Sequence, residues 1–219
     1  SLYDSEPFLV FHREGRAELV MFCDHAVRAF PMALGTPGLE PCELDQHIAW
    51  DIGIAGLGRR LAHSLDAPFF MTAYSRLVLD CNRHLNDPTS IPQESDRVRV
   101  PGNRGLSAED RRRRQAEIFQ PYHEALTEEI KGRVAAGRIP VVISLHSFTP
   151  VMNEFQRPWH VGVLWNKDAR MPVPLIDCMA CAVRQAELLH QLALPKPSVG
   201  SYAPPAGREL IAVDDAVAA

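Results

Sequence analysis

The stretch IPVVISLH (residues 139–146) decides the fold class, because a run of apolar, mostly β-branched residues ends abruptly on a histidine. A short apolar run between turn residues is typical of a strand that is buried on both faces. Gly137 separates this run from the segment before it. The stretch therefore predicts a central strand that delivers His146 to one edge of a sheet.

Upstream segments repeat this pattern. Residues 18–23 predict a short buried strand that is followed at once by Asp24 and His25. Residues 68–74 predict a second strand, and residues 77–79 a third short one. Ligand sites of α/β sheets lie at the carboxyl ends of the strands, so we expect these polar side chains at one such edge.

Helices are expected between the strands. Apolar residues at helical spacing predict a helix over residues 47–65. A longer helix is expected over 107–136, with a capping box formed by Ser107 and Asp110 and a kink or break at Pro121. Alternating strands and helices indicate an α/β fold with a central sheet. Two later segments, 161–165 and 183–194, are expected to add a strand and a helix.

Composition excludes several classes of protein. The chain has 219 residues, 46% of them hydrophobic and 23% charged, which is typical of one globular domain. No apolar run approaches the roughly 20 residues that span a bilayer, so we expect no membrane partner. The net charge of −4 gives no reason to expect nucleic acid, and Arg111–Arg114 is interpreted as a solvated helix face. Five cysteines and no secretory leader pattern predict a cytoplasmic protein with reduced thiols.

The histidines at the strand ends suggest a metal site. Zinc hydrolases use three protein ligands and keep one position open, and His and carboxylates are the usual donors. His25 and His146 each follow an apolar strand and could supply two ligands. His47 and Asp51 are four residues apart, on one face of the expected helix, and either could supply the third. The alternative is that these are buried histidines bonded to backbone carbonyls.

The segment SRLVLDCNR (residues 75–83) suggests an anion-binding site. Arginine presents a planar, permanently charged fork that matches carboxylates. Arg76 and Arg83, with Asn82 and Asp80 to orient them, suit an acidic substrate. One arginine would hold a carboxylate while the other polarises a scissile carbonyl. The alternative is that both arginines form surface salt bridges.

Taken together, these residues resemble the N-formylglutamate amidohydrolase family. The resemblance extends across residues 23–165, where the matching blocks occur in family order. The blocks are CDHA (23–26), HIAWDIG (47–53), SRLVLDCNR (75–83), PYH (121–123), LHSFTP (145–150) and RPWHVGVL (157–164).

The resemblance implies a fold and an activity. The fold would be a three-layer α/β/α sandwich with a mixed central sheet, phosphorylase/hydrolase-like in class and similar to the zinc carboxypeptidases and aspartoacylases. The reaction would be hydrolysis of a small N-acyl acidic amino acid, with N-formyl-L-glutamate giving formate and glutamate as the leading candidate. The alternatives are an inactive relative that binds an acidic small molecule, and a zinc hydrolase of short acidic peptides.

The resemblance also implies roles for individual residues, with one Zn²⁺ per chain. His25, His47 and His146 would be the zinc ligands, with Asp51 the rival of His47 for the third position. Arg76 and Asp51 would be the catalytic groups. Asn82 and Arg83 would bind the carboxylate of a small acidic substrate.

The chain departs from the family pattern in two places. The zinc carboxypeptidase motif H-x-x-E would place a glutamate where this chain has Arg28. The chain is expected to be one amidohydrolase domain over residues 1–219, in which 178–219 do not match the family and form a divergent tail. The resemblance implies a general base in an acidic block near the end of the family sequence, and this block is not found here. Glu154 and Glu209 are the candidate substitutes.

Overall fold

The computed structural model describes residues 6–152 and 154–158 of the chain. The strand expected over 161–165 and the helix expected over 183–194 lie outside the described residues.

The core of the fold is a mixed sheet of four strands in the order β1-β3-β2-β6. The strands are β1 (Phe8–Phe11), β2 (Leu19–Cys23), β3 (Phe69–Thr72) and β6 (Val141–Ser144). β3, β2 and β6 are parallel, and β1 pairs with β3 in the antiparallel direction. The three strands predicted around residues 18–23, 68–74 and 139–145 are thereby confirmed, and their carboxyl ends lie at one edge of the sheet.

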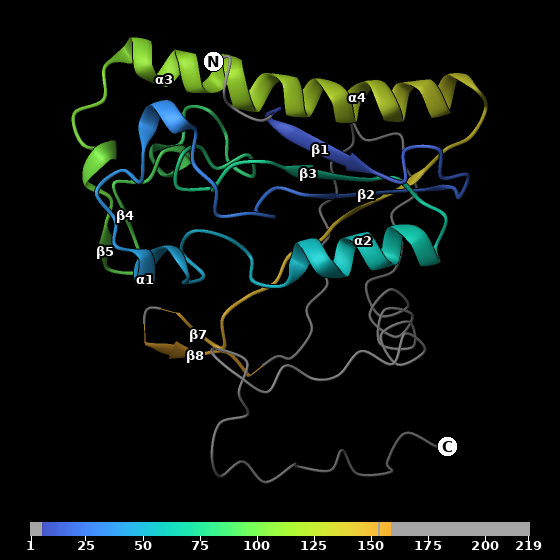
Figure 1. Cartoon of the computed structure of the whole chain (residues 1–219). Helices are drawn as coiled ribbons and strands as arrows, with labels where there is room; N and C mark the ends of the chain where they lie inside the picture. Colours follow the sequence, from blue (N-terminus) through green and yellow to red (C-terminus); the bar gives the residue numbers. More distant parts are fainter. Residues whose placement is uncertain (1–5, 153, 159–219) are drawn as a thin grey trace, which may run out of the picture.

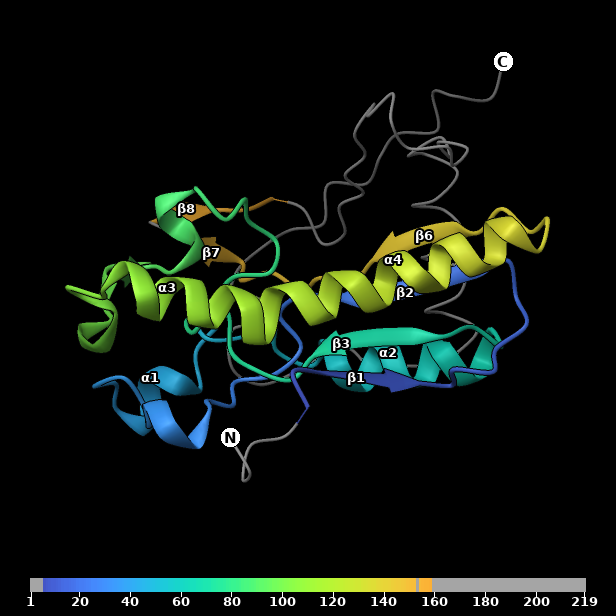
Figure 2. The same ribbon diagram turned by 90° about the horizontal axis from the view of Figure 1, so that it is seen from above.

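Helices cover both faces of this sheet (Figure 1). A long rod lies over one face and consists of α3 (Ala108–Arg114), the π-helical segment η4 (Gln115–Phe119) and α4 (Gln120–Ala135). The opposite face carries α2 (Ile54–Ser64). Seen from above, the rod runs along the sheet, and α2 lies beneath β3 (Figure 2).

Alternation along the strands produces the two apolar layers. Val20 and Phe70 pack with Tyr122 of α4 in one cluster of buried residues. Met21 and Phe69, their neighbours in sequence, pack on the α2 side in a second cluster. Successive side chains of a strand point to opposite faces, so a sheet covered on both faces requires apolar residues at every position. This explains why the strands are continuous apolar runs.

The long helix is confirmed, but it does not break at Pro121. Ser107 and Asp110 form the predicted capping box, with the Ser107 hydroxyl accepting from the Asp110 amide at 3.0 Å. Pro121 stands directly after the start of α4, and the π-helical segment η4 precedes it. A π-segment widens the helix locally, so it accommodates a residue that cannot donate to the preceding turn. The rod therefore continues through the proline.

Two predictions about secondary structure are wrong in part. The helix expected over 47–65 begins only at Ile54, because Gly53 adopts a left-handed conformation with φ of 82° at its N-cap. Residues 77–79 are not a strand: a turn spans 76–78, in which the Val78 amide donates to the Ser75 carbonyl at 2.9 Å and the Leu77 amide to the Ser75 hydroxyl at 3.2 Å. The segment from Arg76 to Asp80 therefore lies outside the sheet ladder.

Short elements fill the connections. They are the helix α1 (Pro41–Leu44), the 3-10 turns η1 (Met32–Leu34), η2 (Pro88–Ser90) and η3 (Pro101–Asn103), and two hairpins formed by β4 (Glu94–Ser95) with β5 (Val98–Arg99) and β7 (Val151–Met152) with β8 (Phe155–Gln156). Within the described part of the chain, no helix combines the length and the apolar character needed to cross a membrane.

Candidate active site

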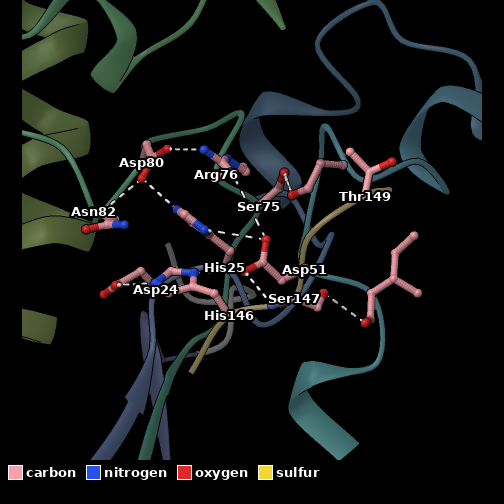
Figure 3. Close-up of polar contacts among 12 residues, drawn as sticks. Asp24, His25, Asp51, Ser75, Arg76, Asp80, Asn82, His146, Ser147 and Thr149 are labelled. Atoms are coloured by element: carbon pink, nitrogen blue, oxygen red, sulfur yellow. Dashed lines mark hydrogen bonds and ion pairs between the residues drawn. The ribbon is translucent and has the colours of Figure 1, made fainter. Parts of the chain in front are cut away.

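The loops at the carboxyl ends of the parallel strands bring a cluster of polar side chains together (Figure 3). Asp24 and His25 follow β2, and His146 follows β6 after one residue. Asp51 comes from the loop before α2, and its amide donates to the carbonyl of His25 at 2.8 Å. This backbone bond holds the Asp51 loop against the end of β2, so residues far apart in sequence share one site.

His25, Asp51 and His146 could together hold a metal ion. One ligand atom from each of them lies within 4.8 Å of the others. His146 Nδ1 is 2.8 Å from Asp51 Oδ2, and His25 Nδ1 is 3.6 Å from Asp51 Oδ1. The His25 Nδ1 atom is buried and has no hydrogen-bond partner, which is costly unless something binds it. Two imidazoles and a carboxylate around such an atom fit the donor set of a catalytic zinc site.

Asp80 fixes the orientation of the His25 ring. His25 Nε2 lies 2.7 Å from Asp80 Oδ1, and both side chains are buried. A proton on Nε2 shared with this carboxylate leaves the lone pair of Nδ1 directed at Asp51 and His146. Asp80 Oδ2 also accepts from Arg76 at 2.8 Å, and Asp80 Oδ1 accepts from the Asn82 amide at 2.9 Å. Asp80 was expected to orient the arginines, but sequence alone did not reveal its bond to His25.

Burial and the neighbouring polar groups shift the pKa values of these side chains in opposite directions. Burial by itself would raise the pKa of Asp51, but the hydrogen bond from His146 and the nearby His25 ring lower that pKa to about 2. Burial is the largest influence on Asp80 and opposes its ionisation, but the bond and charge of His25, the Arg76 charge and the Asn82 amide together lower the pKa of Asp80. Burial lowers the pKa of His25, but the two carboxylates beside it raise that pKa above its usual value. The site is therefore built to hold positive charge between carboxylates.

The outer nitrogen of His146 faces two further groups. Its Nε2 atom is 3.0 Å from the Ser144 hydroxyl and 3.7 Å from Asp24 Oδ2. Asp24 is buried, its Oδ1 has no hydrogen-bond partner, and burial raises its pKa. No separate role was predicted for Asp24 from the sequence. Its position directly before His25 nevertheless indicated that it would lie at the same edge of the sheet as His25.

His47 does not belong to this cluster. Its Nε2 atom lies 2.9 Å from Asp96 Oδ2, in the turn between β4 and β5. The prediction placed His47 and Asp51 on one helical face, but the chain is not helical until Ile54. The structure therefore brings Asp51, and not His47, together with His25 and His146.

The expected substrate-binding residues lie at the rim. Arg76 is partly buried, and its NH1 atom is 3.9 Å from Asp51 Oδ1. Its positive charge therefore lies close to the His25, Asp51 and His146 cluster. Asn82 lies beside Asp80 (Figure 3). Asn82 and Arg83 are both exposed. Among the possible substitutes for the general base, Glu154 is exposed and bonded to Arg97 at 2.6 Å, and Glu209 lies outside the described residues.

The mixed α/β sheet thus places two histidines and an aspartate that could hold a metal ion beside the carboxyl ends of its parallel strands, where α/β sheets bind ligands. The family described as N-formylglutamate amidohydrolase matches residues 17–195. The chain belongs to this family. The match also extends into the segment after Cys178, beyond the blocks that carried the resemblance.

Solved structures similar to the chain include the following two. The gene product Atu2144 from Agrobacterium tumefaciens is 34% identical, with a TM-score of 0.73, over 76% of this chain and 66% of that one. An N-formylglutamate amidohydrolase from Ralstonia eutropha is 23% identical, with a TM-score of 0.50, over 66% of this chain and 58% of that one, and shows a likeness of fold. The chain thus spans less than two-thirds of the length of either structure. No curated protein matches the chain.

Proposed function

We propose that the protein is a zinc-dependent amidohydrolase that cleaves the amide bond of a small N-acyl acidic amino acid. N-formyl-L-glutamate is the leading substrate, with formate and glutamate as products. The observation that carries this proposal is the convergence of His25, Asp51 and His146, with their ligand atoms within 4.8 Å and the buried His25 Nδ1 lacking any other partner. Membership of the N-formylglutamate amidohydrolase family supports the reaction class.

His25, Asp51 and His146 would hold the metal, and when bound there a zinc ion supplies the Lewis acidity that makes water reactive near neutral pH. Asp80 keeps the proton of His25 on Nε2, so that the Nδ1 lone pair remains available. The Ser147 amide donates to Asp51 Oδ2 at 3.3 Å and helps to fix that carboxylate. These contacts hold the donor atoms in place before any ligand binds.

Arg76 would stabilise negative charge on the acyl oxygen. Its guanidinium is held by Asp80 at 2.8 Å and lies at the edge of the cluster, where an amide carbonyl would approach. A fixed cation at that point favours the charge that develops during attack on the carbonyl carbon. In the overall reaction the oxygen of one water molecule would bond to the acyl carbon, the carbon–nitrogen bond would break, and a proton of that water would pass to the departing amine of the amino acid.

Asn82 and Arg83 would bind the substrate carboxylate at the rim. They lie two and three residues after Asp80, and their amides donate to the Asp80 carboxylate at 2.9 Å and to its carbonyl at 3.2 Å, which fixes where they stand relative to Arg76. A guanidinium paired with an amide donor selects for an acidic compound. This arrangement separates the group that binds the carboxylate from the group that faces the scissile amide.

The helices on both faces of the mixed sheet support a three-layer α/β/α sandwich of the zinc carboxypeptidase-like kind as the complete architecture. We infer that residues 1–219 form one amidohydrolase domain of this kind.

The direct test is formate release from N-formyl-L-glutamate by the full chain. We expect turnover that is lost on chelation and restored by zinc. H146Q should abolish turnover, whereas H47Q, which removes a histidine outside the cluster, should retain most of it. Equal loss in both variants, or turnover that resists chelation, would contradict the proposal.

A panel of compounds identifies the substrate class. Turnover of short acidic peptides, with none of N-formyl or N-acetyl amino acids, would replace the leading substrate by a peptide. A thermal shift with N-formyl-L-glutamate but no turnover of any compound would show a binding protein and not an enzyme.

A further inference from the structure

The four arginines at the start of the long helix do not share one environment. Arg112 and Arg113 are exposed and pair with Glu109 and Glu117 at 2.7 Å, as a solvated helix face would. Arg114 is only 7% exposed. A guanidinium is charged at all ordinary pH values, so it is buried only where acceptors meet it. The prediction of a solvated face is therefore wrong for Arg114.

Arg114 and Asn103 form a buried bracket around two consecutive carbonyls. Arg114 NH1 donates to the carbonyl of Val78 at 2.9 Å and to Asn103 Oδ1 at 2.8 Å. Asn103 is fully buried, and its Nδ2 donates to the carbonyl of Leu77 at 2.7 Å and to that of Pro92 at 2.8 Å. Each side chain thus binds one carbonyl of the Leu77–Val78 pair, and the two side chains bind each other.

These carbonyls need such partners because the segment around them is buried but is not a strand. Leu77 and Val78 are at most 1% exposed. They lie in a turn, so no neighbouring strand supplies donors for them. Arg76 stands directly before this pair, and Asp80 follows two residues after it. The position of the turn therefore sets the positions of both site residues.

We propose that Arg114 and Asn103 are positioning residues of the active site. They hold the backbone of Leu77 and Val78, which places the Asp80 carboxylate against His25 Nε2 and Arg76. Loss of either side chain leaves the turn free to move, and the Nδ1 atom of His25 is then no longer held toward Asp51. The meaning of this bracket for zinc and turnover rests on the proposed function, but its effect on His25 does not.

Arg133 provides a matched control. It is 5% exposed and lies in the last turn of α4, at the end of the long helix remote from Arg114. Its guanidinium donates to the carbonyls of Ala17 at 2.6 Å and Gly15 at 2.8 Å, before the start of β2. Arg133 thus makes the same kind of bond at similar burial, at the end of the sheet opposite to the site. Substitution there tests stability without touching the Asp80 turn.

The experiment compares R114K, N103D and R133K in the full chain, with zinc affinity measured by competition against a chelator and stability by urea unfolding. Lysine keeps the charge but lacks the planar fork, and aspartate keeps the acceptor for Arg114 but removes the donor to Leu77. We expect R114K and N103D to weaken zinc binding about tenfold or more, the effect typical of residues that orient metal ligands. R133K should lower stability and leave zinc affinity within about twofold, as for distant independent sites.

A second readout needs neither zinc nor turnover. The ring nitrogen signals of His25 in the zinc-free protein, assigned with H25Q, report which nitrogen carries the proton. They should shift in R114K and N103D and not in R133K. Shifted signals in a protein that binds no zinc and releases no formate would refute the proposed function and support the bracket.

The inference is overturned if R114K and N103D match R133K in both zinc affinity and His25 signals. If the wild type is active and the variants lose only stability, the positioning role of Arg114 and Asn103 is refuted while the proposed function stands. Should R114K fail to fold, N103D carries the same comparison.

Discussion

Charged side chains are buried at both ends of the sheet, but the two ends differ in how completely the polar atoms of these side chains are hydrogen-bonded. At the amino ends of the parallel strands, all three nitrogens of the Arg133 guanidinium have partners, namely Glu129 and the carbonyls of Ala17 and Gly15. At the carboxyl ends, Asp24 Oδ1 and His25 Nδ1 are buried with no hydrogen-bond partner. An unsatisfied buried polar atom costs about 1–3 kcal/mol, so its persistence indicates a group that awaits a ligand.

This difference separates residues that hold the fold from residues that hold a ligand. Changes at the carboxyl ends should act on metal binding first, and changes at the amino ends should act on stability alone. The following predictions test that separation, beginning with the largest effect.

Asp51→Asn should produce the largest loss of zinc affinity. Asp51 faces both His25 and His146, and an amide is a far weaker metal ligand than a carboxylate. We expect stoichiometric zinc binding to disappear in isothermal titration. D66N is the control, because Asp66 bonds His12 at 2.7 Å at the other end of the sheet and is partly exposed. Zinc affinity that survives D51N would exclude this cluster as the metal site.

Asp80→Asn should weaken zinc binding by about 10- to 100-fold without abolishing it, as expected for a partner that orients a metal-binding histidine. The amide keeps the shape of Asp80 but loses the negative charge that holds His25 Nε2 and Arg76. The same titration measures the effect. An affinity equal to that of the wild type would show that Asp80 serves Arg76 only.

Gly15→Ala should lower stability and spare the metal site. A Cβ at residue 15 would stand 2.7 Å from the Asp66 carbonyl oxygen, which is backbone and cannot move aside easily. We expect a loss of about 1–3 kcal/mol in the free energy of unfolding, the usual cost of overpacking, measured in urea. G56A in α2 is the control, because nothing lies within 4 Å of a Cβ there. A weaker zinc affinity in G15A would show that the two ends are not independent.

Ser107→Ala should have the smallest effect, about 1 kcal/mol, through loss of the helix cap. The Ser107 hydroxyl accepts from the Asp110 amide and bonds the Asp110 carboxylate at 2.6 Å, in an exposed setting. Thermal unfolding measures the shift, and S107T, which keeps a hydroxyl at the N-cap, should retain most of the stability. No difference between S107A and the wild type would mean that the cap contributes nothing.

The sequence predicted the parts of the fold that follow from local patterns. Continuous apolar runs located three strands, and the pairing of Ser107 with Asp110 located the start of the long helix. The helix prediction was wrong for residues 47–53. Their apolar spacing is helical, but the left-handed conformation of Gly53 prevents the helix from extending to them. The turn at 76–78 was missed because its buried carbonyls are satisfied by side chains distant in sequence.

The candidate site was predictable to the same extent. His25 and His146 were found because they end strands, which is a local signal. The choice between His47 and Asp51 depended on where a helix begins, and the roles of Asp80 and Arg114 depended on contacts across 55 and 36 residues. Spacing along the chain contains no information of that kind.

The central claim is that the carboxyl ends of the parallel strands hold one zinc ion between His25, Asp51 and His146. Elemental analysis of the full chain, purified without chelator or nickel resin, tests it most directly. We predict about one zinc per chain in the wild type and in H47Q, as expected for a site with three protein ligands, and none in D51N. A wild-type chain that contains no metal and takes up none on incubation with zinc would contradict the account.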